Sequence, residues 1–213
     1  MPEPRAFAVG LCGGSGIAYG LRLVEVLLGA GHSVHLVATP AACRVLVHEA
    51  GAKLDLGRPD LAGLFPASLR ARLQVHDPAA VEAAPASGSA GIAATVLVPC
   101  SMGTLARVAH GFSSNLVERM ADVALKEGRR LVVVPRETPL SRIHLRNMLT
   151  LVEAGAVLMP AMPGFYHKPQ TVQDLVDFVV AKVLGSLGLD HAIVRRWQTP
   201  PSSSASAWDE GEA

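Results

Sequence analysis

The chain has 213 residues, half of them hydrophobic, which is enough for one substantial core and too few for two ordinary domains. Its 19 basic and 18 acidic residues leave a net charge of +1 without a lysine or arginine block, so neither nucleic-acid nor membrane binding is expected. Three widely spaced cysteines and eight histidines match neither a disulfide framework nor a metal motif, and no run of about 18 apolar residues occurs. A cytoplasmic protein without a metal site is predicted.

Short β-rich segments alternate with longer segments of helical period, which predicts an α/β fold. The first strand is expected at 6–11, followed by a glycine-rich turn at 12–16 and a helix that ends near Gly29. A second strand is expected at 33–38, and Pro40 suits the first turn of the next helix. The pattern is typical of a single Rossmann-like domain with an open parallel sheet and helices on both faces.

Residues 51–93 are predicted to be loops with one short strand at 73–75. A strand at 94–99 is apolar throughout, as a strand buried on both faces should be. The remaining expected elements are a helix that begins at Ser101, a helix from about 114, a strand at 131–134, a helix that buries Leu145, Met148, Leu149 and Val152, a strand at 156–159, and an amphipathic helix over 172–187. The domain is expected to span 1–198, and the polar segment 199–213 to be a disordered tail.

The glycine-rich turn between the first strand and its helix is the general phosphate-binding element of α/β folds. Its glycine spacing does not match the dinucleotide fingerprint, and the second strand ends in Ala38 and Thr39 rather than in an acidic residue. The motif therefore argues against NAD and favours a mononucleotide. Taken alone, it is equally well explained as a tight turn without a ligand.

Two further motifs follow buried strands, where open α/β sheets place their ligands. Arg136 and Glu137 could hold a phosphate and transfer protons, although an isolated pair of this kind is more often a surface ion pair. The segment 101–104 offers hydroxyls and free N–H groups at a helix start, although Ser101 could be an ordinary cap. Cys100 is interpreted as a packed thiol because no histidine is near it in sequence.

Six segments occur in the order seen in UbiX-type flavin prenyltransferases, and the chain resembles that family over roughly residues 6–197. They are GGSGIAYG at 13–20, SGS at 87–89, PCSMGT at 99–104, ADVALKE at 121–127, RETPL at 136–140 and GFYHKPQ at 164–170. Enzymes of this family are related to the flavin-dependent cysteine decarboxylases and use no metal. The resemblance implies a flavin-binding domain that joins a dimethylallyl group from dimethylallyl phosphate to N5 and C6 of reduced FMN. The product, prenylated FMN, serves UbiD-type decarboxylases.

The resemblance also implies the roles of individual residues. FMN contacts are implied for Gly13, Gly14, Ser15, Thr39, Ser101, Met102, Gly103, Thr104 and Arg136. Contacts to the phosphate of dimethylallyl phosphate are implied for Tyr166, Lys182, Lys126 and Arg136. Roles in catalysis are implied for Glu137 as the acid/base and for Ser15, Lys126 and Arg119. The family forms dodecamers with the flavin between subunits, so a homo-oligomer is expected.

The chain departs from the family pattern at three positions. Thr39 stands for the usual serine and keeps the hydroxyl, and Lys182 stands for arginine and keeps the charge. Ala90 stands where an aromatic ring usually shields the prenyl carbocation, which favours a non-catalytic FMN-binding paralogue as one alternative. The other alternative, a flavin-dependent cysteine-type decarboxylase, usually has asparagines that the loops at 99–104 and 160–164 lack.

Overall fold

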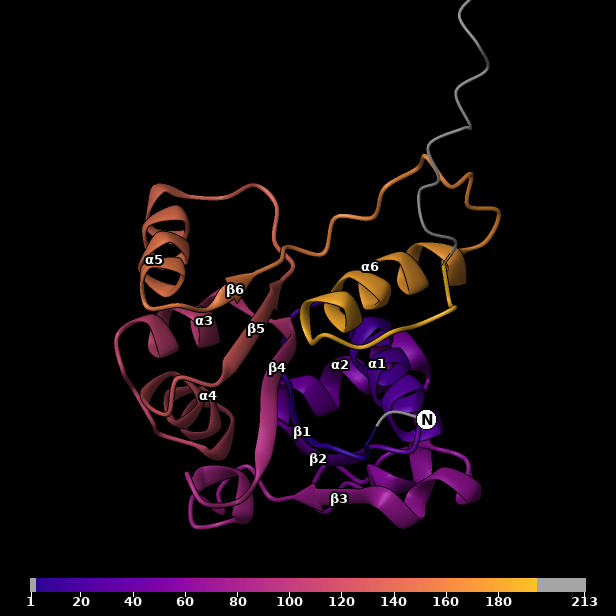
Figure 1. Cartoon of the computed structure of the whole chain (residues 1–213), viewed down its shortest axis with the longest axis horizontal. Coiled ribbons are helices and arrows are strands. Elements are labelled where there is room, and N and C mark those ends of the chain that lie inside the picture. Colours follow the sequence, from indigo (N-terminus) through magenta and orange to yellow (C-terminus); the bar gives the residue numbers. More distant parts are fainter. Residues whose placement is uncertain (1–2, 195–213) are drawn as a thin grey trace, which may run out of the picture.

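The computed structural model describes residues 3–194 and contains a six-stranded parallel sheet (Figure 1). The strand order is β3-β2-β1-β4-β5-β6, and every neighbouring pair is parallel. The strands are β1 (Ala6–Leu11), β2 (Ser33–Ala38), β3 (Leu73–His76), β4 (Ile92–Cys100), β5 (Arg130–Pro135) and β6 (Val157–Leu158). The predicted α/β fold with an open parallel sheet is confirmed.

In the described part of the chain, six α-helices cover the two faces of the sheet (Figure 1). On one face lie α1 (Ile17–Gly29), α2 (Pro40–Ala50) and α6 (Val172–Ser186). On the other face lie α3 (Met102–Ala109), α4 (Leu116–Lys126) and α5 (Arg142–Glu153). Alternate residues of β1 point to opposite faces, so Phe7 and Val9 join the first core and Ala8 joins the second.

The segment between α2 and β4 is irregular, as predicted, apart from β3 and three short 3-10 helices. These are η1 (Ala62–Leu64), η2 (Ala67–Arg72) and η3 (Ala84–Ala86).

The strand order reverses between β1 and β4, which makes the carboxyl ends of these two strands the switch point of the sheet. A glycine allows α1 to lie very close to this point. A Cβ atom on Gly20 would lie 2.4 Å from the carbonyl oxygen of Val98 in β4. The close packing of helix on strand fixes where the turn after β1 can lie.

The prediction for the buried face of α5 is wrong, apart from Met148. The helix is rotated so that Asn147, Met148 and Leu151 face the core. The other apolar side chains of α5 are about half exposed or more: Ile143, Leu145, Leu149 and Val152. Both faces of α5 carry apolar residues, so periodicity alone could not choose between them.

Within residues 3–194, no helix is both long and apolar enough to cross a membrane. In the same part of the chain, no group of three or more His, Cys, Asp or Glu side chains is placed so that it could hold a metal ion. The predicted tail at 199–213 lies outside the described residues.

Candidate active site at the switch point

The turns that follow β1, β4 and β5 are joined to one another at the carboxyl edge of the sheet. The N–H of Cys12, directly after β1, donates to the carbonyl oxygen of Pro99 in β4 at 3.1 Å. The side-chain Nε of Arg136, directly after β5, donates to the carbonyl oxygen of Ser15 at 3.3 Å. These bonds bring the glycine-rich turn and Arg136 together, although the two are more than 100 residues apart in sequence.

A cleft of about 400 Å³ opens between the N-termini of α2 and α3. Thr39 caps α2 by accepting the N–H of Ala42 at 3.1 Å. Ser101 caps α3 by accepting the N–H of Thr104 at 3.3 Å, and its hydroxyl bonds the Thr104 hydroxyl at 3.1 Å. Because a helix N-terminus carries partial positive charge and free N–H groups, two of them at one cleft suit an anion such as a phosphate.

The cleft wall contains residues that were predicted and residues that were not. It is lined by Gly13, Thr39, Pro40, Ala41, Arg44, Pro78, Ser101, Gly103, Thr104, Arg107, Asn115 and Glu118. Five of these were predicted from the resemblance to contact FMN: Gly13, Thr39, Ser101, Gly103 and Thr104. Of the other predicted contacts, Met102 is buried at the start of α3 and Gly14 approaches the backbone of Cys100.

The charged residues of the cleft were missed in the sequence. Glu118 is only 1% exposed, and its carboxylate accepts the N–H of Ser114 at 2.8 Å and the side-chain amide of Asn115 at 2.9 Å. It also forms an ion pair with the Nε of Arg107 at 2.7 Å. Asn115 at the N-cap and Glu118 three residues later form a recognisable capping pattern, which could have indicated α4 but not the cleft. Arg44 brings a second positive charge to the wall.

A second carboxylate, Glu49, occupies the N-terminus of α1 and was also missed. It accepts the N–H groups of Gly16 at 2.8 Å and Ile17 at 3.1 Å. Burial raises the pKa of Glu49, but hydrogen bonds from Ser15, Gly16 and Ile17 and the charge of Arg136 outweigh it, so the pKa lies below its ordinary value. Glu49 therefore lies as an anion beside the glycine-rich turn. No local signal marks it, because the contact spans more than 30 residues of sequence.

Glu137 lies at the same edge of the sheet, directly after Arg136, and is exposed. Its carboxylate accepts the N–H of Thr138 at 3.0 Å. Arg136, Glu137 and Ser15 are thus brought to one region of the molecule. The cleft and these residues form the best-defined candidate site.

Lys126 and Arg119 lie on α4, which runs away from the cleft. Arg119 bonds the carboxylate of Asp122 at 2.9 Å, one turn further along the helix. Lys126 ends the helix and bonds Glu127. An 11-residue helix is about 16 Å long, so Lys126 is nearly one helix length from the cleft. Lys126 lies instead near Gly88, because the Glu127 carboxylate that it bonds lies against the Cβ position of that glycine.

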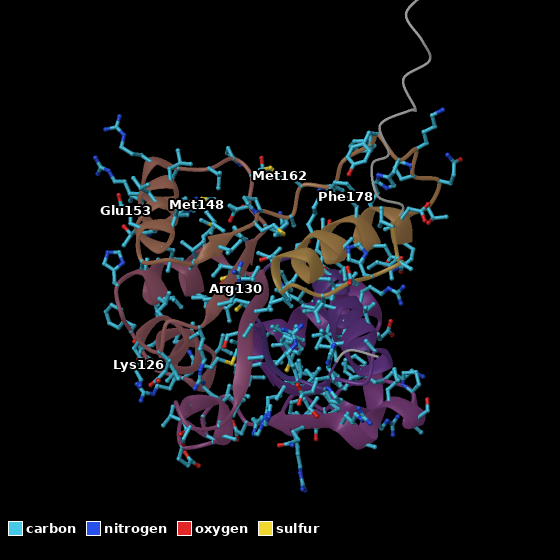
Figure 2. All side chains as sticks on the ribbon, viewed as in Figure 1. Lys126, Arg130, Met148, Glu153, Met162 and Phe178 are labelled. Atoms are coloured by element: carbon cyan, nitrogen blue, oxygen red, sulfur yellow. The ribbon has the colours of Figure 1, made fainter. Side chains whose placement is uncertain are left out.

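Tyr166 and Lys182 form a third group, around the ring of Phe178 on α6. The Tyr166 ring packs edge-on against Phe178 with 5.6 Å between centroids, and the Lys182 ammonium lies 5.5 Å from the Phe178 centroid. Figure 2 shows Phe178 and Lys126 on opposite sides of the molecule. One chain therefore brings together the predicted FMN residues, but not Lys126 with Tyr166 and Lys182.

Sequence comparison places the chain in a family. The family model described as Flavoprotein matches residues 1–184. The chain is 49% identical over 193 residues to the flavin prenyltransferase UbiX of Alkalihalophilus pseudofirmus, which covers 91% of this chain and 96% of that protein. The chain belongs to the UbiX flavin prenyltransferases of the Flavoprotein family.

Solved structures of UbiX proteins share this fold over nearly their whole length. The crystal structure of AnUbiX in complex with FMN and dimethylallyl pyrophosphate matches with a TM-score of 0.81 and 38% identity, over 92% of this chain and 99% of that one. A dodecameric FMN-dependent UbiX-like decarboxylase from Escherichia coli matches with a TM-score of 0.79 and 41% identity, over 91% and 100%. The resemblance seen in the sequence motifs is confirmed.

Proposed function

We propose that the chain joins the dimethylallyl group of dimethylallyl phosphate to N5 and C6 of reduced FMN, giving prenylated FMN. The observation that carries this proposal is the anion cleft at the switch point, which brings five of the predicted FMN residues to one wall. The relative from A. pseudofirmus, named as a flavin prenyltransferase, and AnUbiX, crystallised with FMN and dimethylallyl pyrophosphate, support it.

The residues of the cleft fit the phosphate of FMN. The hydroxyls of Thr39, Ser101 and Thr104 can donate to phosphate oxygens, beside the free N–H groups of two helix N-termini. Glu118 neutralises Arg107, so Arg44 supplies the remaining positive charge of the wall. The flavin ring would then extend along the sheet edge towards Ser15 and Arg136. When bound, the reduced flavin supplies the nucleophilic atoms of the reaction.

Two carboxylates beside the glycine-rich turn can handle protons. Glu137 is exposed next to Arg136, and it is assigned as the acid/base that removes a proton from the flavin ring system. Glu49 bonds the N–H groups at the start of α1 and interacts with the Ser15 side chain, so it can hold the Ser15 hydroxyl in one orientation. Arg136 fixes the same turn from the other side through the Ser15 carbonyl oxygen.

Arginine and lysine side chains would stabilise the leaving phosphate. Arg136, Lys126, Tyr166 and Lys182 can donate charged or neutral hydrogen bonds to it, which is the charge stabilisation that phosphate departure requires. We propose on this basis that the reaction needs no metal ion.

A homo-oligomer would complete this phosphate site. Because Lys126 and Phe178 lie on opposite sides of one chain, Lys126 and the pair Tyr166 and Lys182 would have to come from different copies (Figure 2). The exposed apolar side chains of α5 offer a surface for such contacts, with Leu145 and Leu149 each more than half exposed. The E. coli structure is described as dodecameric, and we propose the same assembly here. A UbiD-type decarboxylase is the proposed recipient of the product.

The two alternatives make different demands on the site. In one chain Ala90 precedes the amino end of β4, at the opposite edge of the sheet from the cleft. A flavin could therefore meet Ala90 only across a contact between copies. A non-catalytic FMN-binding paralogue would bind FMN and leave the donor intact, and a cysteine-type decarboxylase would release carbon dioxide from a peptide that ends in cysteine.

A phosphate-release assay separates these functions. The chain is incubated without oxygen either with reduced FMN and dimethylallyl phosphate, or with oxidised FMN, the electron acceptor of the decarboxylation, and a peptide that ends in cysteine. Inorganic phosphate and carbon dioxide are measured. The proposal predicts phosphate release that requires reduced FMN, and no carbon dioxide. Carbon dioxide from the peptide would indicate the cysteine-type decarboxylase. FMN binding with neither product would indicate the non-catalytic paralogue.

A further inference from the structure

The ring of Phe178 lies among the side chains to which the donor phosphate is assigned. It is 8% exposed and lies on the face of α6 that packs on the core. Tyr166 packs edge-on against it at 5.6 Å and the ammonium of Lys182, one turn further along α6, lies 5.5 Å from its centroid. A single aromatic ring thus contacts both a phenol and a cation that come from separate segments.

The loop before α6 rests on the same ring. His167 stacks on Phe178 with 5.1 Å between centroids and 11° between planes. Both ring nitrogens of His167 are buried, and neither has a hydrogen-bond partner within residues 3–194. The histidine is therefore held by ring stacking rather than by hydrogen bonds, so its position in the loop depends on Phe178.

Gly164 sets how closely the loop before α6 can approach the ring of Phe178. A Cβ atom at this position would lie 2.9 Å from Cζ of Phe178 and 3.3 Å from the Tyr166 ring. An alanine would push against both rings, so the position of Tyr166 is coupled to that of Phe178. The ring itself is fixed to the body of the protein, because the neighbouring Asp177 forms an ion pair with Arg22 of α1 at 2.7 Å.

We infer that Phe178 is a positioning residue for the donor phosphate: its ring sets the separation between the Tyr166 phenol and the Lys182 ammonium. The inference rests on the proposed function. A cation over an aromatic face is attracted by the ring quadrupole, and edge-on aromatic pairs have a preferred geometry. An aliphatic side chain of similar size would fill the space and lose both preferences. FMN would bind elsewhere, at the cleft, and would not be affected.

The first test is Phe178→Leu in the full-length, FMN-loaded protein, with Phe65→Leu as the matched control. Phe65 is 2% exposed and belongs to the same core, so the control makes the same change in packing without touching Tyr166 or Lys182. We expect KM for dimethylallyl phosphate to rise about tenfold in Phe178→Leu, the combined size of the two ring contacts, with kcat and the Kd for FMN near wild type. Equal KM values in the two variants would overturn the inference.

A second test leaves Phe178 in place. Gly164→Ala presses on the ring and should raise KM for the donor in the same direction, whereas Gly185→Ala, which has nothing within 4 Å, should not. Phe178→Leu should also raise KM by a smaller factor in a Lys182→Met background than in the wild type, because the ring acts partly through that ammonium. The inference would be contradicted if Phe178→Leu raised KM by the same factor in the Lys182→Met background as in the wild type, or if Gly164→Ala left KM unchanged. If the wild type releases no phosphate from the donor, the proposed function itself has failed.

Discussion

Replacing Glu118 by glutamine tests whether the carboxylate buried in the cleft wall stabilises the fold. In the structure one carboxylate oxygen accepts from Asn115 and Arg107, and the other accepts from the N–H of Ser114. A glutamine has only one acceptor oxygen. Its NH₂ group must take the place of the other oxygen and would then face a hydrogen-bond donor instead of accepting from it. An unmatched buried group of this kind costs about 1–3 kcal/mol.

Loss of the ion pair adds to that cost, but only modestly. The Arg107 side chain is 59% exposed, and pairs in contact with water are worth about 1 kcal/mol or less. The free energy of unfolding should therefore fall by about 1–4 kcal/mol, which lowers Tm by roughly 2–16 °C in a chain of this size.

The measurement is thermal unfolding of the FMN-free protein, followed by circular dichroism. Glu25→Gln is the matched control, because Glu25 pairs with Arg22 at 3.5 Å on the surface and should shift Tm by no more than about 2 °C. If the Glu118→Gln protein unfolds at the same temperature as this control, the buried carboxylate contributes no more to stability than an exposed one, contrary to the prediction.

Three further predictions concern proton transfer, packing and pH. Glu137→Gln should keep FMN affinity near wild type and reduce formation of the ring-closed product by roughly a hundredfold; equal losses of binding and product would make it a structural partner of its arginine neighbour. Gly20→Ala should lower the free energy of unfolding in urea by about 1–3 kcal/mol, because its Cβ would strike β4, whereas Gly29→Ala, with nothing within 4 Å, should change it by less than about 1 kcal/mol. Burial lowers the pKa of His35 and of His76, so below about pH 6.5 the unfolded chain binds more protons than the folded one. The free energy of unfolding, measured in urea, should therefore decrease as the pH is lowered from about 6.5, and a flat profile would count against this.

The regular part of the fold could be predicted because local signals agree there. Short apolar runs bounded by glycine and proline place β1 and β2 at the residues expected. The hydroxyl residues at the cleft were also predictable, since Thr39 and Ser101 directly follow strands and cap the next helices. Such signals lie within a few residues of the feature they predict.

The rest depends on contacts between distant segments. Glu49 reaches the start of α1 from the end of α2, and Arg107 reaches Glu118 from a neighbouring helix. The orientation of α5 was mispredicted because Leu145 and Leu149 are as apolar as the buried Met148 and Leu151. A chain that packs against further copies would carry an exposed apolar face. The residue pattern of such a face is the same as that of a face buried in the core, so the sequence cannot distinguish the two.

Prenyl transfer by this chain can be measured as the exact mass of the flavin released after one turnover with reduced FMN and dimethylallyl phosphate. The proposed function predicts a flavin that has gained one C₅H₈ unit, formed in proportion to the phosphate released and absent when the donor is omitted. Unchanged FMN, recovered from protein that is fully loaded with it, would contradict prenyl transfer and leave the cleft as a site that binds flavin without that reaction.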